Sequence, residues 1–87
     1  MQENDMGRKV GIVTHYYSNI QVGIVELNSD VNLGDKLRFK GNSTDFEQEL
    51  KDMQFEHEFV NVGKAGQEVG IKVDEKVRDG DEVYLLE

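Results

Sequence analysis

The chain has 87 residues, which leaves room for one domain and excludes large catalytic scaffolds such as a barrel of strands and helices. It contains no cysteine, so disulfides, thiolate metal sites and cysteine nucleophiles are excluded, and we expect a cytoplasmic protein. Its 18 Asp and Glu residues against 10 Lys and Arg residues give a formal charge of −8, which disfavours contact with phosphate backbones. No apolar run approaches the ~20 residues of a membrane-spanning helix.

The order of residue types predicts a short tail and one all-β domain. Residues 1–8 are polar and predict a flexible N-terminal tail, and residues 9–87 form the expected domain. Within that domain, Val, Ile, Phe and Tyr occur in short runs that Gly, Asn, Asp and Ser separate, which is typical of an all-β fold. We expect a small closed antiparallel β-barrel of about six strands, because closure removes exposed strand edges.

The first two apolar runs predict a hairpin. Val10–Tyr17 and Ile20–Leu27 are each long enough for a strand, and Ser18-Asn19 supplies the break between them. The apolar residues of the second run change parity half-way along it. This change predicts a bulge near Gly23.

A second hairpin is predicted around Gly41-Asn42. The alternation of Lys36–Lys40 allows two registers of equal parity. A two-residue turn places Arg38 opposite Asp45, whereas a four-residue turn places Lys40 opposite Asp45. Either register collects apolar side chains on one face and sets bases opposite acids on the other.

The segment after this turn, Ser43–Phe55, needs a bulge between Leu50 and Met53 to keep its apolar residues on one face. A helix over Thr44–Gln54 is the alternative, because the same apolar residues also fit helical spacing. We favour the strand because the flanking segments have strand patterns. Residues 41–60 hold six acids and one lysine, a local charge of −5, which predicts a solvated outer strand face that suits basic partners.

A Gly-Asp pair precedes a strand pattern twice, at Gly34-Asp35 and at Gly80-Asp81. Glycine adopts backbone angles that other residues resist, and aspartate accepts hydrogen bonds from nearby backbone. The repeat indicates either pseudo-symmetric halves of the barrel or two common turns. Strand alternation also sends Tyr16 and Tyr17 to opposite faces, so one of them faces the core. The predicted core comprises Val10, Ile12, Val25, Leu27, Leu37, Phe39, Phe46, Leu50, Met53, Phe55, Val69, Ile71, Val83 and Leu85.

Motifs that carry catalytic chemistry are nearly absent. His15 and His57 are the only histidines and lie on different runs, so metal-ligand spacing is absent. The chain has no phosphate-binding loop and no nucleophile elbow. The segment 79–82 lacks the calcium-loop pattern and predicts a turn. We therefore expect a protein that is not an enzyme and has no cofactor and no metal.

Two motifs, in order, resemble domain 2 of translational GTPases such as elongation factor Tu. They are Leu33-Gly34-Asp35-Lys36-Leu37 and Ala65-Gly66-Gln67-Glu68-Val69-Gly70-Ile71, within a resemblance that covers about residues 8–87. The resemblance implies the translation-protein β-barrel. That barrel is also similar to the C-terminal module of the collagenase-like peptidase family, which includes RNA-modifying members.

In elongation factors the second motif lies near the aminoacyl end of bound tRNA, and the family's contact positions fall near Gln54, Glu56 and Glu68, none of which matches. Two acids there would repel RNA, so we expect direct nucleic-acid binding to be weak or absent. The candidate partner-binding residues are Gln54, Glu56, Lys64, Gly66, Glu68 and Gly70.

The predicted function is a non-catalytic, translation-elongation-factor-like binding domain that engages a basic protein or ribonucleoprotein partner and no membrane. The alternative is an accessory subunit or module of an RNA-modifying enzyme of the collagenase-like peptidase family.

Overall fold

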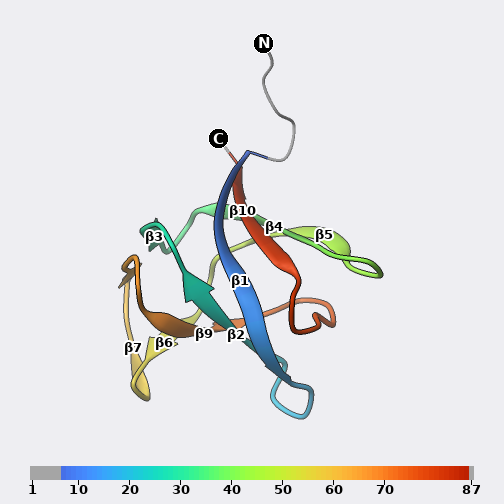
Figure 1. Ribbon diagram of the computed structural model, residues 1–87. Coiled ribbons are helices and arrows are strands. Elements are labelled where there is room, and N and C mark those ends of the chain that lie inside the picture. The colour runs from blue at the N-terminus through green and yellow to red at the C-terminus, as the bar shows by residue number, and fades with distance from the viewer. Residues whose placement is uncertain (1–6, 87) are drawn as a thin grey trace.

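The computed structural model describes residues 7–86, which form strands and turns (Figure 1). The strands are β1 (Arg8–Tyr17), β2 (Val22–Leu27), β3 (Val31–Asn32), β4 (Lys36–Lys40), β5 (Asp45–Glu49), β6 (Met53–Phe55), β7 (Glu58–Phe59), β8 (Val62–Gly63), β9 (Glu68–Lys72) and β10 (Glu82–Leu86). The predicted all-β class is therefore confirmed. Over these residues, no helix has the length and apolar character needed to cross a membrane.

The expected tail, 1–8, falls mostly on residues 1–6, which lie outside the described residues, as does Glu87. β1 already begins at Arg8. Eight strands form one antiparallel sheet in the order β5-β4-β10-β1-β2-β9-β6-β7, and β3 pairs with β8 in a second, two-stranded sheet.

The predicted closed barrel of six strands is wrong, because the large sheet stays open. The predicted strand 43–55 breaks after Glu49, and its two halves join different neighbours: β5 pairs with β4, and β6 pairs with β9. β5 and β7 therefore remain as edges, and in Figure 1 β5 and β7 lie on opposite sides of the molecule. The helix considered over 44–54 is also wrong.

A buried glutamine side chain links β5 to the end of β9, where backbone pairing is missing. Gln48 is only 4% exposed. Its Nε2 donates to the carbonyl oxygen of Lys72 at 2.8 Å, and its Oε1 accepts from the N–H of Asp74 at 2.7 Å. The side chain thus provides hydrogen-bond partners for two backbone groups at and just beyond the end of β9.

The hairpin of β4 and β5 has the four-residue turn, with Lys40 opposite Asp45. The Arg38 guanidinium also reaches Asp45, at 2.8 Å. On the other face the rings of Phe39 and Phe46 stack with centroids 5.1 Å apart. The structure therefore selects one of the two predicted registers, in which bases stand opposite acids on one face, while Leu37, Phe39 and Phe46 share the other face with the buried Gln48.

Most of the predicted core is buried, but Ile12 is 38% exposed. The reason is a bulge in β1: Lys9 pairs with Tyr84 and Gly11 pairs with Val83, so Val10 is an extra residue and the parity changes after it. The predicted Phe46, Phe55 and Leu85 are partly buried against the core. Four valines that the predicted core does not include are also buried: Val13, Val31, Val73 and Val77.

The bulge predicted near Gly23 is wrong, because β2 alternates regularly with Gly23, Val25 and Leu27 inward. A bulge lies instead in the partner strand, where Val13 pairs with Val25 and His15 pairs with Ile24. Two of the three outward residues of β2, Val22 and Ile24, are themselves apolar, which is why the pattern resembled a change of parity.

Three turns of the chain share one hydrogen-bond pattern. In each, the last residue of the turn bonds back to the first residue through both its backbone and its side chain. Asp35, Gln67 and Asp81 each donate a backbone N–H to the carbonyl three residues earlier. Each side chain in turn accepts from the N–H of that earlier residue, at 2.8, 3.0 and 2.9 Å respectively. The preceding glycines, at 34, 66 and 80, have φ of 94°, 91° and 94°, which glycine adopts without strain.

Candidate binding groove

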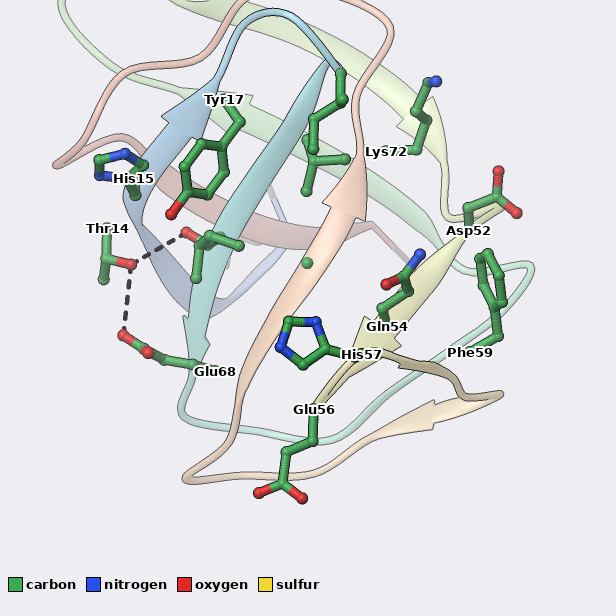
Figure 2. Close-up of a pocket in the computed structure, with 14 residues that line it drawn as sticks. Thr14, His15, Tyr17, Asp52, Gln54, Glu56, His57, Phe59, Glu68 and Lys72 are labelled. Atoms are coloured by element: carbon green, nitrogen blue, oxygen red, sulfur yellow. Dashed lines mark hydrogen bonds between the residues drawn. The ribbon is translucent and has the colours of Figure 1, made fainter.

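A row of outward-facing residues crosses five strands of the large sheet. Successive backbone pairs join His15 of β1 to Ile24 of β2, Ile24 to Gly70 of β9, Gly70 to Gln54 of β6, and Gln54 to Phe59 of β7. A second row, beside the first, runs through Tyr17, Val22 and Lys72. These eight residues all line one groove of about 950 Å³, shown in Figure 2.

Gly70 forms the centre of the groove floor. A methyl group there would lie 3.2 Å from Cγ1 of Val22 and 3.6 Å from Cδ1 of Ile24. The missing side chain therefore leaves a hollow bordered by two aliphatic side chains, and Gln54 pairs with Gly70 from the neighbouring strand β6.

The walls of the groove are apolar and exposed to solvent. Phe59 is 72% exposed, Ile20 54% and Tyr17 46%. The rings of His15 and Tyr17 lie with centroids 4.5 Å apart. Tyr16 packs against the core, so the prediction that the two tyrosines face opposite ways is confirmed.

The turn between β6 and β7 holds His57 over the groove. Glu56 and His57 are its two central residues, with φ of 53° and 69°. Positive φ at both positions defines a type I′ hairpin turn, which favours Asn and Gly. Both residues thus adopt a left-handed conformation that is unfavourable for their type.

Charged side chains at the groove are mostly acidic. Asp52, Glu56 and Glu68 face a single cation, Lys72, a balance of −2 by three charges against one. Within residues 7–86, none of the four forms an ion pair. Glu68 is reached by the hydroxyl of Thr14, at 3.5 Å.

Clear pKa shifts occur at the other end of the sheet. A hydrogen bond from Arg38 lowers the pKa of Asp45, and a hydrogen bond from the Tyr84 hydroxyl lowers the pKa of Glu82. The carboxylate of Glu82 in turn raises the pKa of Tyr84. Asp45 and Glu82 are therefore each held by partners within the fold.

Four of the six predicted partner-binding residues come together in the groove: Gln54, Glu56, Glu68 and Gly70. Lys64 and Gly66 lie in the turn before β9 and do not line it. The apolar lining, including Tyr17, Val22 and Phe59, was not among the predicted residues. The apolar outward positions of β2 were the one signal that could have revealed it. In the part of the chain described, no group of three or more His, Asp or Glu side chains could hold a metal ion.

Comparison with known proteins places this fold among domains of peptidase-family proteins. The chain is 38% identical over 79 residues to the "Uncharacterized protease MJ0090" of Methanocaldococcus jannaschii, a match that covers 90% of this chain. The chain spans about a fifth of that relative, since the match covers 19% of it. No family model matches the chain.

Two crystal structures of the C-terminal domain of a Geobacillus thermoleovorans protein assigned as a U32 peptidase share the fold. One superposes with a TM-score of 0.85 and 17% identity over all of both chains. Its selenomethionine variant gives a TM-score of 0.84 and 19% identity, covering 88% of this chain and 98% of the other.

These relatives overturn the resemblance to the elongation-factor barrel and to translation factors. The motifs that carried it contain Gly34-Asp35 and Gly66-Gln67, and both belong to the repeated turn described above. The two motifs therefore indicate a local turn, which can occur in an open sheet as well as in a closed barrel.

Proposed function

We propose that this chain is a non-catalytic binding module that serves a protein of the U32 peptidase family. The similarity of 90% of the chain to a segment of a protease relative is the observation that carries the proposal. The same fold occurs as a C-terminal domain in another such protein, which supports a role beside a separate catalytic part.

The groove supports binding rather than catalysis. Its floor is mostly aliphatic, around Val22, Ile24 and Gly70, with the amide of Gln54 beside it, and its charged groups are Asp52, Glu56, Glu68 and Lys72. Such a surface offers contact area and a few oriented polar groups, which is the usual design of a binding site. The partner we propose is a basic protein or ribonucleoprotein, because the rim is acidic. An RNA-modifying catalytic partner fits this proposal if the partner, and not this chain, makes the contacts with RNA.

Two measurements on the purified chain test the proposal. The chain alone should not hydrolyse casein or a collagen-like peptide. It should associate with a purified U32-type protein encoded in the same genome, as measured by isothermal titration calorimetry. Hydrolysis that a groove substitution abolishes would contradict the non-catalytic role, and the absence of association at both ~50 mM and ~500 mM salt would contradict the proposed partner.

A further inference from the structure

We propose that the groove binds an extended polypeptide segment in which apolar side chains stand beside Arg or Lys side chains. This inference rests on the proposed binding function and specifies its ligand. The groove lies on the outer face of β1, β2, β9, β6 and β7, and its exposed apolar side chains have no cover within residues 7–86 (Figure 2).

The dimensions of the groove fit an extended chain. The row from His15 to Phe59 crosses four gaps between neighbouring strands, which at ~4.8 Å each span ~19 Å. An extended segment advances ~3.3 Å per residue, so about six residues cover this length. A volume of about 950 Å³ is at the upper end of ordinary small-molecule sites, and an elongated ligand uses it better than a compact one.

Apolar anchor points occur at both ends of the row and in its middle. Tyr17 and Ile20 stand at one end, and Phe59 stands at the other. Between them Gly70 adds no side chain to the floor, so a ligand side chain can pack over it against Val22 and Ile24. Aromatic side chains that border a desolvated hollow commonly carry most of the binding energy of an interface.

A polar group for the ligand backbone lies in the same row. Gln54 is exposed, and its amide makes no side-chain hydrogen bond within residues 7–86. The amide can donate and accept at once, which matches the N–H and C=O of an extended peptide. The apolar floor alone would leave such backbone groups without partners.

The distribution of charge sets the composition of the segment and the place of its basic side chains. Glu56 and Glu68 lie toward the lower end of the groove in Figure 2, and Lys72 lies at the upper end. Basic side chains of the ligand therefore belong beside Glu56 and Glu68, away from Lys72. Nucleic acid is disfavoured, because one lysine cannot offset three carboxylates along a phosphate backbone.

Fluorescence anisotropy with labelled peptides of about eight residues tests this inference. The first probe alternates Val, Phe and Ile with Arg and Lys. The second replaces its bases with Glu, the third replaces its apolar residues with Ser, and the fourth is mixed tRNA. We expect the first probe to bind with a Kd tighter than about 10⁻⁴ M and the others at least about tenfold more weakly.

Matched variants distinguish binding in the groove from nonspecific attraction between the acidic chain and a basic peptide. Glu56→Gln with Glu68→Gln should weaken binding of the first probe about tenfold. Glu47→Gln with Glu49→Gln makes the same change of charge on β5, outside the groove, and should change binding less than about twofold. Phe59→Ser should also cost about tenfold, whereas Leu33→Ser, at an exposed residue outside the groove, should not.

Gly70→Val gives a test that fills the hollow and removes no charge. It should weaken binding about tenfold, and circular dichroism melting should confirm that each variant still folds. Equal weakening by both glutamate pairs, equal binding of the serine peptide, or saturable binding of tRNA tighter than that of the first probe would overturn the inference.

Association with the U32-type protein, measured on the same variants, keeps the two proposals apart. If no peptide binds while that association persists through every groove variant, the groove inference is wrong and the proposed function stands. If the first probe binds through the groove but the U32-type protein does not associate, the proposed function is wrong and the groove inference stands.

Discussion

The two ends of the large sheet carry similar acids in opposite circumstances. At the β4–β5 end, Asp45 is held by Arg38 at 2.8 Å and by Lys40 at 3.6 Å. At the groove end, Asp52 and Glu56 form no ion pair within residues 7–86. Within the acidic run of residues 41–60, Asp45 thus stabilises a hairpin, whereas Asp52 and Glu56 are not used in this way by the described part of the fold.

The largest expected effect on stability comes from removing the side chain of Gln48, which links β5 to the end of β9. Gln48→Leu leaves the carbonyl of Lys72 and the N–H of Asp74 without partners, and should lower the free energy of unfolding by about 2–3 kcal/mol. Urea denaturation measures this loss. Gln54→Leu is the matched control in the exposed groove and should change stability by less than about 0.5 kcal/mol. Equal effects would show that Gln48 does not link the ends.

Charge reversal should separate the paired end from the unpaired end. Arg38→Glu removes the contact with Asp45 and sets an acid opposite Glu47, so the melting temperature should fall by a few degrees at ~20 mM salt and less at ~500 mM. Lys72→Glu makes the same change of charge in the groove and should cost less, because Lys72 lacks an ion pair within residues 7–86. A loss for Arg38→Glu that is independent of salt would contradict the pairing.

The turn between β6 and β7 should become more stable when glycine replaces a residue whose positive φ is unfavourable. His57 has a φ of 69°, so His57→Gly should raise the free energy of unfolding by about 0.5 kcal/mol. Gly66→Ala is the converse: no atom lies within 4 Å of its added methyl group, and its φ of 91° should make alanine destabilising by about 1 kcal/mol. Chemical denaturation checks both signs. A loss of stability with His57→Gly would mean that His57 contributes contacts beyond the turn.

The smallest expected effect is a pH dependence confined to the paired end. Since Arg38 lowers the pKa of Asp45 in the folded state, the pair stabilises the fold above the ordinary aspartate pKa. This stability is lost as the pH falls through the lowered pKa. The difference in melting temperature between the natural protein and Asp45→Asn should therefore be larger at about pH 6 than at about pH 2. A constant difference would contradict the assignment.

How far the sequence predicts this structure depends on how local each feature is. Alternation from Lys36 to Lys40 was enough to predict which residues of the hairpin share a face, because both strands are adjacent in the chain. The turns at Gly34 and Gly80 were also local and were predicted. Their hydrogen bonds are shared by the turn at Gly66, which explains how short motifs suggested a different family.

The remaining features required contacts between distant residues. Val73 and Val77 are buried although they lie outside the strands, so no periodicity marks them. The groove joins Tyr17 on β1 to Phe59 on β7, and only the sheet order brings these strands to one face. The side chain of Gln48 bonds to the backbone of Lys72 and Asp74, more than twenty positions away in the sequence. No local sequence pattern predicts such a contact.

Chemical-shift mapping of the basic, apolar peptide onto the isotope-labelled chain tests the central claim most directly, because it reports on both ends at once. The claim predicts that amide shifts change with peptide concentration at Tyr17, Ile24, Gln54 and Gly70, while those of Arg38–Lys40 and of β5 stay constant. Shift changes that concentrate on β4 and β5, or that spread evenly over all acidic strands, would contradict the division of the acids into a paired end and an available one.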